Sequence, residues 1–410
     1  MSAPRPTLLM PLFHPNLDVI HNGWLGGVIF VQNLVRLLSD LRDTERPRVL
    51  VLTDAEPASD FVKTMTAFDA VEGVFKPSGE AVVVKEALHP LVTVNGAIDN
   101  TRVTQMFTDA ATLFPACQAL FHPYKALHWI PDLQHKYLPH LFEAEELRQR
   151  DYEFDRMLHK QRFVLVSSHA AADDVARFYP NPTAKIYVWP FVSGVTSDAP
   201  VGPDPRVTYQ LPEKYLFAPN QFWIHKDHLT LFKAIKLLAD QGQQITVVCT
   251  GSRGDARKPT HFADLARYVQ DNGIAHLIKY LGIVDHATLT NLFRYATAVA
   301  QPSLFEGWST VVEDTKSIGR PIFLTDLPVH YEQATTPNPF YFFRQGDAAH
   351  LAEQLSAHWP NLTPGPDADA ETAGHLARAA RARTAARAFI GIMNDMAAIT
   401  AAETQNRSAP

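Results

Sequence analysis

The feature that most constrains the fold is a repeated alternation of short apolar segments with amphipathic ones along the 410 residues. Parallel strands need a crossover between them, usually a helix, so this pattern favours parallel sheets covered by helices on both faces. In the first half of the chain, strands are predicted at 6–13, 48–53, 81–86, 126–131, 163–168 and 185–190. The predicted fold class is therefore α/β.

The alternation stops and then restarts, which predicts two domains. The segment 193–209 (SGVTSDAPVGPDPRVTY) is rich in Pro, Gly and Asp and has no periodicity, as is typical of a linker. Strands are predicted again at 215–219, 244–250, 277–282 and 298–302, with amphipathic helices between them. We predict domains over 1–195 and 208–384, with ligands bound between them at the carboxyl ends of the strands. The Ala- and Arg-rich tail that follows 367 is helical by propensity.

Composition and charge exclude several classes of protein. The formal net charge of -6 provides no overall attraction to nucleic acid, and the interleaved basic and aromatic residues of a nucleic-acid binder are missing. No apolar run approaches the ~18 residues of a membrane span, so membrane contact is expected to be peripheral at most. The two cysteines, Cys117 and Cys249, cannot form a disulfide framework or a cysteine metal site, and they fit a reducing cytoplasm. The amino terminus is expected to be a first strand rather than a signal peptide.

The segment 305–326 (FEGWSTVVEDTKSIGRPIFLTD) is the strongest candidate for a ligand-binding element. Thr310 and Glu313 have the spacing of a capping box, Gly319 is typical of a helix end, and the apolar residues after it predict a strand. The backbone N–H groups of 307–310 (Gly307, Trp308, Ser309 and Thr310) would then converge with the positive end of a helix, an arrangement that suits a phosphate. Glu306 could bind hydroxyl groups beside it. A phosphate next to hydroxyl groups describes a nucleotide sugar.

Other loops that follow predicted strands supply further candidates. Gly26 and Gly27 come after the first strand and would let the backbone approach a ligand, or would serve only to start a helix. In 220–228 (NQFWIHKDH), Lys226 is a candidate to neutralise a diphosphate, unless it is solvated beside a capping Asp227. The two histidines of that loop have no carboxylate or cysteine ligand beside them, so no metal site is predicted.

Two more strand ends carry polar residues with open roles. Asp132 and His135 could orient a hydroxyl group or stabilise charge, or could be ordinary loop residues. Gly251 and Ser252 form a turn suited to a phosphate or a ribose, with an ordinary turn as the alternative. The sequence lacks a Walker lysine loop, GxSxG and GxGxxG, which argues against P-loop hydrolysis, serine esterase chemistry and hydride transfer.

The chain resembles the family 4 retaining glycosyltransferases, whose GT-B fold has two Rossmann-like domains with parallel sheets that face each other across a cleft. The resemblance is carried mainly by 302–322 (PSLFEGWSTVVEDTKSIGRPI), which is similar to the family's motif of two glutamates separated by seven residues. Glu306 matches the first glutamate, which implies contact with the donor sugar. Asp314 matches the second, which implies contact with the ribose, and Glu313 is the alternative for that contact.

The resemblance implies roles for other residues as well. Lys226 matches the lysine that meets the diphosphate, whereas the family's arginine five residues earlier is replaced by Gln221, so that Asn220 would have to compensate. Gly26 and Gly27 match the family's amino-terminal glycine loop. Asp132 lies where the family often has His-Asp, with His135 as a substitute for that histidine. The fold also implies that a final helix and tail, 385–410, pack back towards the first domain.

The implied activity is transfer of a sugar from a nucleoside diphosphate sugar to a hydroxyl of a saccharide or glycolipid, with retention of the anomeric configuration and no metal or other cofactor. The family's commonest setting is the synthesis of bacterial surface polysaccharide or lipopolysaccharide. The residues leave two alternatives open. One is a nucleotide-sugar epimerase of the same architecture, and the other, suggested by Gln221 and Asp314, is a non-catalytic subunit that binds a nucleotide sugar.

Overall fold

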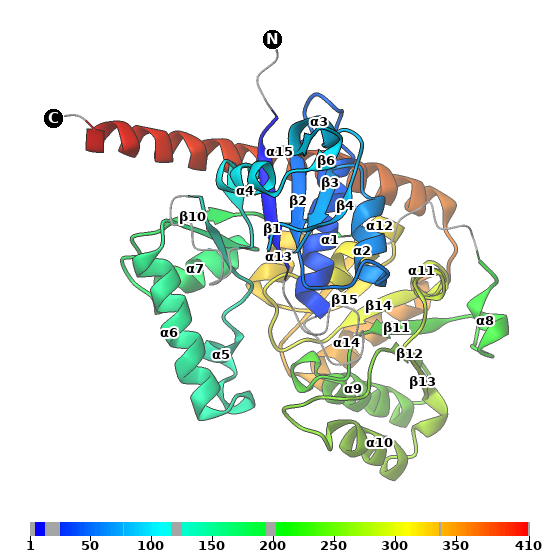
Figure 1. Ribbon diagram of the computed structural model, residues 1–410. Coiled ribbons are helices and arrows are strands. Elements are labelled where there is room, and N and C mark those ends of the chain that lie inside the picture. The colour runs from blue at the N-terminus through cyan, green and yellow to red at the C-terminus, as the bar shows by residue number, and fades with distance from the viewer. Residues whose placement is uncertain are drawn as a thin grey trace.

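The computed structural model describes residues 5–12, 25–76, 78–115, 125–193, 202–335 and 338–408. Two α/β domains follow one another along the chain, and a long carboxy-terminal helix, α15, crosses both of them (Figure 1). Cys117 and residues 194–201 of the predicted linker lie outside the described residues. Cys249 lies in a buried strand, and burial raises the pKa of its thiol.

The amino-terminal domain is built on one continuous set of strands. A five-stranded sheet has the order β4-β3-β2-β1-β7, and a three-stranded sheet has the order β10-β9-β8. A parallel bridge between Leu113 and Ala126 joins the two sheets. Within these two sheets, the described strand pairs are parallel except β3 with β4, so the predicted strand at 81–86 exists but runs antiparallel at the sheet edge. The strands are β1 (Thr7–Pro11), β2 (Arg48–Leu52), β3 (Val71–Phe75), β4 (Ala81–Val84), β7 (Thr112–Leu113), β8 (Leu127–Ile130), β9 (Phe163–Val166) and β10 (Lys185–Val188).

Helices and one small hairpin surround this sheet. Residues Gly26 and Gly27 are the second and third residues of α1, the helix that follows β1. The hairpin consists of β5 (Thr93–Val94) and β6 (Ala97–Ile98). The helices are α1 (Leu25–Ser39), α2 (Asp60–Ala67), α3 (His89–Val92), α4 (Asn100–Thr108), α5 (Gln134–Tyr137), the 3-10 helix η1 (Pro139–Leu141), α6 (Ala144–Lys160) and α7 (His169–Phe178).

The second domain has the strand order of a dinucleotide-binding fold. Its six-stranded parallel sheet has the order β13-β12-β11-β14-β15-β16, so the chain starts in the middle, builds one side and then returns to build the other. The loops after β11 and β14 consequently meet at the point where the strand order reverses, which is where such sheets bind ligands. The strands are β11 (Tyr215–Pro219), β12 (Thr246–Thr250), β13 (Ile278–Gly282), β14 (Ala298–Gln301), β15 (Ile322–Thr325) and β16 (Phe340–Phe343).

The helices of this domain alternate with its strands. They are α8 (Pro205–Thr208), η2 (Ile224–Lys226), α9 (His228–Asp240), α10 (His261–Asp271), η3 (Ala275–Leu277), α11 (His286–Tyr295), α12 (Thr310–Ile318), α13 (Pro328–Gln333), α14 (Ala348–His358), η4 (Trp359–Asn361) and α15 (Ala368–Ser408). The last of these starts against the second domain, where its Glu371 pairs with the buried Arg294 at 3.0 Å.

Helix α15 then becomes part of the amino-terminal core. Phe389 and Met393 are fully buried among residues of β1, β2 and α1. The indole Nε1 of Trp189 donates a hydrogen bond to the carbonyl of Ala385 at 2.9 Å. Burial of these apolar side chains fastens the last segment of the chain to the first domain. Figure 1 shows the helix running from the second domain to beyond the first.

The structure confirms most of the predicted elements and corrects some. Strands β3, β5, β6, β7 and β16 were not predicted, and most predicted strands are shorter at one or both ends. The capping box was wrong: Ser309, not Thr310, caps α12, because its hydroxyl accepts a hydrogen bond from the N–H of Val312. Glu313 points instead into a buried ion-pair cluster. Gly319 ends α12 with a φ of 74°, as predicted.

Two buried histidines predict a stability that depends on pH. Burial lowers the pKa of His228 to about 3 and that of His128 to about 4. Both are therefore neutral in the folded protein, whereas the unfolded chain takes up protons once the pH falls below about 6.5. Above that pH the two histidines do not lower the free energy of unfolding. As the pH falls from about 6.5 towards 4, protonation of the unfolded chain lowers the free energy of unfolding by about 1.4 kcal/mol per pH unit for each histidine.

Urea unfolding at pH 7.5 and pH 5.0 measures this effect. We expect a lower free energy of unfolding at pH 5.0 and a smaller difference in the His228→Phe variant. The phenyl ring of that variant can replace the imidazole, which stacks on Phe222 with 4.3 Å between the ring centroids. Equal free energies at the two pH values would contradict the assignment of neutral buried histidines.

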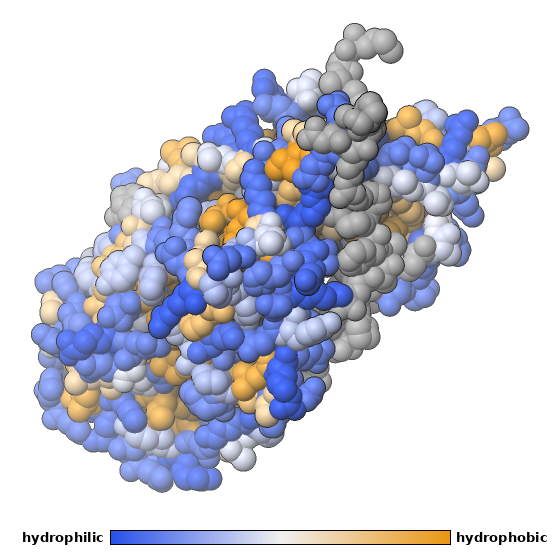
Figure 2. Space-filling model, turned by 90° about the vertical axis from the view of Figure 1, so that its left-hand side faces the viewer, coloured by the Kyte–Doolittle hydropathy of each residue, from blue (hydrophilic) through white to orange (hydrophobic). Residues whose placement is uncertain are grey.

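The surface has no broad apolar area on the face shown in Figure 2, where hydrophobic residues are interspersed with hydrophilic ones. The exposed large hydrophobic residues, among them Leu91, Tyr152 and Val207, belong to different elements. Within the described ranges, no helix has the length and apolar character needed to cross a bilayer.

Candidate active site at the domain junction

The loops after β11 and β14 form the centre of the candidate site. The two strands are neighbours in the sheet, with Leu216 paired to Ala298 and Phe217 paired to Val299. The loop after β11 forms η2, which ends at Lys226, and the loop after β14 carries Glu306 and leads into α12. Parallel pairing therefore brings together two side chains that are 80 residues apart in the sequence.

Lys226 and Glu306 form an ion pair. The Nζ atom of Lys226 donates to Oε1 of Glu306 at 2.6 Å. The lysine side chain is 15% exposed and the glutamate side chain 8%, so neither is freely solvated. Of the alternative reading, the capping aspartate is confirmed and the solvated lysine is wrong. Asp227 does cap α9 by accepting from the N–H of Thr230, but the ammonium group of Lys226 faces Glu306.

A second contact holds the same carboxylate. The side-chain amide of Gln301, at the end of β14, donates to Oε1 of Glu306 at 2.8 Å and to Oγ of Ser303 at 3.0 Å. The carbonyl oxygen of that amide accepts from Nδ2 of Asn220 at 2.9 Å. Gln301 and Asn220 are buried, so these bonds form away from water, where they are strong.

The orientation of Glu306 has a chemical consequence. Both hydrogen bonds end on Oε1, and Oε2 accepts no hydrogen bond from the described part of the chain. A carboxylate accepts through both oxygens, so Oε2 is the one available to a hydroxyl group of a ligand.

The loop that follows Glu306 touches the amino-terminal domain. A Cβ atom on Gly307 would lie 2.3 Å from the carbonyl oxygen of Pro131 and 2.8 Å from Cβ of Asp132. Trp308 donates from its indole Nε1 to the carbonyl of Phe191 at 2.9 Å and packs against the amino-terminal core. Gly307 is therefore required by close approach of the two domains.

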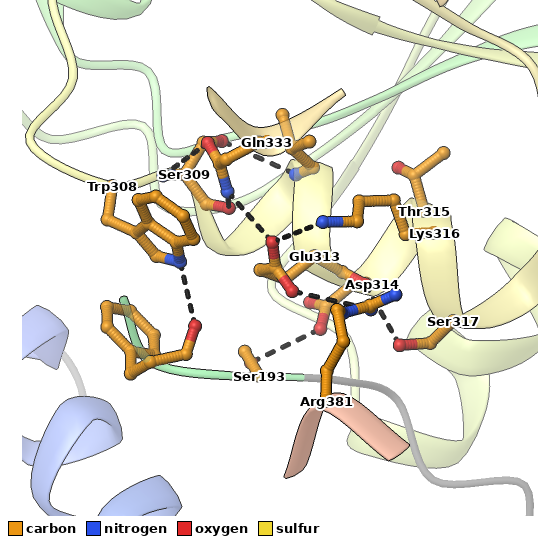
Figure 3. Close-up of polar contacts among 12 residues, drawn as sticks. Ser193, Trp308, Ser309, Glu313, Asp314, Thr315, Lys316, Ser317, Gln333 and Arg381 are labelled. Carbon is orange, nitrogen blue, oxygen red and sulfur yellow. Dashed lines mark hydrogen bonds and ion pairs between the residues drawn. The ribbon is translucent and has the colours of Figure 1, made fainter. Parts of the chain in front are cut away.

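The predicted amide cluster at the start of α12 is partly occupied by a side chain. The N–H of Ser309 donates to Oε1 of Gln333 at 3.2 Å, and Nε2 of Gln333 donates to the carbonyl of Ser309 at 2.9 Å (Figure 3). A glutamine from α13 thus braces the first turn of α12. The positive end of this helix still points towards the loop that holds Glu306.

The two acidic residues within α12 have different surroundings. Glu313 is 1% exposed, with Lys316 at 2.8 Å, Gln333 at 3.2 Å and Arg381 of α15 at 3.5 Å (Figure 3). Asp314 is half-buried and accepts from the hydroxyl of Ser193, at the end of the amino-terminal domain, at 3.3 Å. Of the two, only Asp314 keeps an exposed surface that could contact a ribose.

The loops after β11 and β12 lie against each other. Oε1 of Gln221 accepts from the N–H of Ser252 at 2.6 Å, and Gly251 has a φ of +120°. A Cβ atom on Gly251 would lie 2.5 Å from the carbonyl oxygen of Asn220. The predicted phosphate or ribose turn is thus also a packing contact between neighbouring strand ends.

The candidates of the amino-terminal domain are placed less favourably for chemistry. Gly26 and Gly27 lie in the first turn of α1. Asp132 lies beside Gly307 and accepts from the N–H of Gln134 at 2.9 Å. Nε2 of His135 contacts Oδ1 of Asp151 at 2.9 Å, and burial lowers the pKa of its imidazole. The ring of His135 is buried and turned towards its own domain, so a catalytic role is left as a prediction.

The two histidines beside Lys226 are neutral and buried. Burial, with the charges of Lys226 and Arg257, lowers the pKa of His225, and its Nδ1 accepts from Nη2 of Arg257 at 3.0 Å. His228 stacks on Phe222. Within the part of the chain that the structure describes, no group of three metal-ligating side chains occurs.

Some residues of the site escaped sequence reasoning. Gln301, Gln333 and His330 are all buried, and His330 donates from Nδ1 to the carbonyl of Thr325 at 2.7 Å. The only available signal was a polar residue at the end of an otherwise apolar strand, in AVAQ for Gln301. Long-range contacts, not local pattern, define the partners of all three.

A comparison with models of protein families finds a match in the second domain. Residues 207–358 match the family model described as glycosyl transferases group 1, and this range contains both Lys226 and Glu306. These residues are thus similar to a group 1 glycosyltransferase domain. The match covers β11 to α14, which form the six-stranded sheet and its helices. A search of curated protein sequences finds no match.

Solved structures that match nearly the full length of the chain show that it has the GT-B fold. HepE from Anabaena, in complex with UDP and glucose, shares 16% identity with a TM-score of 0.64 over 95% of this chain and 100% of its own. A glycosyltransferase from Rickettsia africae shares 12% identity, with a TM-score of 0.60 and coverage of 96% and 98%. Sucrose-phosphate synthase from Thermosynechococcus elongatus shares 14%, with a TM-score of 0.60 and coverage of 98% and 100%.

The contact of the second domain with the amino-terminal domain at Gly307 can be tested by substitution. In Gly307→Ala the new methyl group overlaps the backbone of Pro131, so the domains must separate or the loop must shift. We expect a larger radius of gyration by small-angle X-ray scattering and a lower melting temperature. Gly391→Ala is the control, because its methyl group would meet nothing within 4 Å. An unchanged radius and melting temperature in Gly307→Ala would contradict the close approach.

Proposed function

We propose that the protein is a retaining glycosyltransferase that moves a sugar from a nucleoside diphosphate sugar to an acceptor hydroxyl. The observation that carries the proposal is the pairing of Lys226 with Glu306 at the strand-order reversal of a group 1 glycosyltransferase domain. The ammonium group suits a diphosphate, and the free Oε2 of the carboxylate suits sugar hydroxyls. The complex of HepE with UDP and glucose gives additional support to a donor of this class.

The proposed reaction breaks the bond between the anomeric carbon and the diphosphate oxygen and forms one between that carbon and the acceptor oxygen on the same face of the sugar. The acceptor proton passes to the departing phosphate oxygen. Lys226 and the positive end of α12 stabilise the charge that develops on the diphosphate. Glu306 holds the sugar through Oε2, which reduces the freedom that the reaction must otherwise remove.

The site also contains a candidate contact for the ribose and a source of positive charge. We assign the ribose to Asp314 rather than Glu313, because Glu313 is buried and paired with Lys316. Since Lys226 and α12 supply the positive charge, we propose that transfer needs no metal, and we expect full activity in the presence of EDTA. The proposed acceptor is a saccharide or glycolipid of bacterial surface polysaccharide or lipopolysaccharide synthesis.

A thermal-shift panel of UDP, GDP, ADP and CMP, followed by product analysis, tests the proposed function. We expect one nucleoside diphosphate to raise the melting temperature, because a ligand that binds only the folded state stabilises it. We also expect the matching nucleotide sugar to release the nucleotide faster when saccharide acceptors are added. Stabilisation without turnover or slow hydrolysis would identify a non-catalytic subunit. Release of free sugar and nucleotide that no acceptor accelerates would point to an epimerase.

A further inference from the structure

We propose that Gln301 is a positioning residue that holds Glu306 for the donor sugar when Lys226 moves to the diphosphate. The inference rests on the proposed function and adds a residue to which neither the family match nor the sequence motif assigns a role. One oxygen of Glu306, Oε1, accepts hydrogen bonds from both Lys226 and Gln301.

The two contacts differ in what a bound donor would do to them. The ammonium group of Lys226 lies at the end of a flexible side chain, and a diphosphate with its higher charge would compete with Glu306 for it. The amide of Gln301 has no such competitor, because it is buried and carries no charge. After Lys226 turns to the diphosphate, the contact from Gln301 still orients the carboxylate.

The surroundings of Gln301 prevent its amide from rotating. Asn220 donates to its carbonyl oxygen at 2.9 Å, while its Nε2 is shared between Ser303 at 3.0 Å and Glu306 at 2.8 Å. A flipped amide would face Asn220 with a donor and Glu306 with a second acceptor, so the three partners favour one orientation. These hydrogen bonds link the ends of β11 and β14 to Glu306, the proposed contact of the donor sugar.

Calorimetric titration of the full chain with UDP and UDP-glucose tests the inference. We define the sugar increment as the Kd of UDP divided by the Kd of UDP-glucose. In the wild type we expect an increment above one, and in Gln301→Met we expect it to fall about tenfold or to unity, because a hydrogen bond to a charged group is lost. The Kd of UDP itself should change by less than about twofold.

Matched variants separate positioning from general damage. Gln161→Met removes another buried glutamine, one that bonds to His128 in the amino-terminal domain, and should keep the wild-type increment. Asn220→Ala should lower the increment in the same direction, because it frees the amide of Gln301 to rotate. In a Glu306→Ala background, Gln301→Met should lower the increment no further, since its effect acts through Glu306.

The outcomes distinguish the inference from the proposed function. If none of UDP, GDP, ADP and CMP binds the wild type, the proposed function fails. If GDP binds instead of UDP, GDP and GDP-mannose replace the pair in the same experiment. An increment of one in the wild type, or an unchanged increment in Gln301→Met, overturns the role of Gln301 alone and leaves nucleotide binding intact.

Discussion

Replacement of Glu306 by alanine is expected to lower kcat/KM for sugar transfer by about 10³-fold or more, on the order of 4 kcal/mol of transition-state stabilisation. Among the described residues, this carboxylate is the one acidic group that pairs with Lys226, and its Oε2 is the oxygen available to the sugar. Without it the sugar loses an oriented partner and Lys226 loses a counter-charge in a site that is largely shielded from water. Transfer from the stabilising nucleotide sugar to a saccharide acceptor is the measurement.

Two variants show whether this loss is chemical. Glu306→Gln keeps the shape of the side chain but removes its charge, and it should still lose most activity while its melting temperature stays close to that of the wild type. Glu213→Ala removes an exposed glutamate of the same domain and should have no effect. Wild-type turnover in Glu306→Gln would remove the carboxylate from the proposed mechanism.

Replacement of Glu313 by alanine is expected to lower the free energy of unfolding by about 3–5 kcal/mol. Glu313 and Lys316 are 1% and 2% exposed, with 2.8 Å between their charged atoms, and Arg381 approaches the same carboxylate from α15. Removal of the acid leaves two positive charges in a region that water does not reach. Because Arg381 belongs to α15, the cluster also links this helix to α12. Urea unfolding at pH 7.5 measures the loss.

The comparison with an exposed pair makes this prediction specific. Glu145 and Arg148 also lie three residues apart on a helix, but their side chains are 77% and 69% exposed. Glu145→Ala should therefore cost less than about 1 kcal/mol. The double variant Glu313→Leu with Lys316→Met should recover part of the loss, because apolar side chains can replace a buried ion pair. If Glu313→Ala and Glu145→Ala lower the free energy of unfolding by the same amount, burial does not determine the contribution of the Glu313 ion pairs to stability.

Local pattern was sufficient for most of the buried parallel strands and for the end of α12. The apolar runs at β1, β2, β9, β11 and β14 were predicted because buried parallel strands are apolar along their whole length. Gly319 was predicted as a helix end because glycine adopts a positive φ without steric cost, and its φ is 74°. Strands such as β7, only two residues long, have too few residues for a pattern to form.

The same local reasoning failed where a side chain had two possible partners. Thr310 and Glu313 fit a capping box, yet Ser309 caps α12 and Glu313 pairs with Lys316 and Arg381. The spacing of residues defines which side chains can meet within a turn of helix. It does not reveal that α13 and α15 bring Gln333 and Arg381 to the same helix, where a buried carboxylate gains more from charged partners than from the backbone.

The sequence by itself determined the α/β class and the two units and singled out Glu306 and Lys226 as candidates, because periodicity, glycine positions and motif spacing are local properties. Only the tertiary structure decided how these residues are placed relative to one another. The pairing of β11 with β14 brings Lys226 to Glu306 and sets Gln301 beside them. Contacts within the amino-terminal domain hold His135 against Asp151, and packing of the two domains brings Pro131 against Gly307. These contacts join residues far apart in the chain, and their geometry exists only once both sheets and α15 have packed.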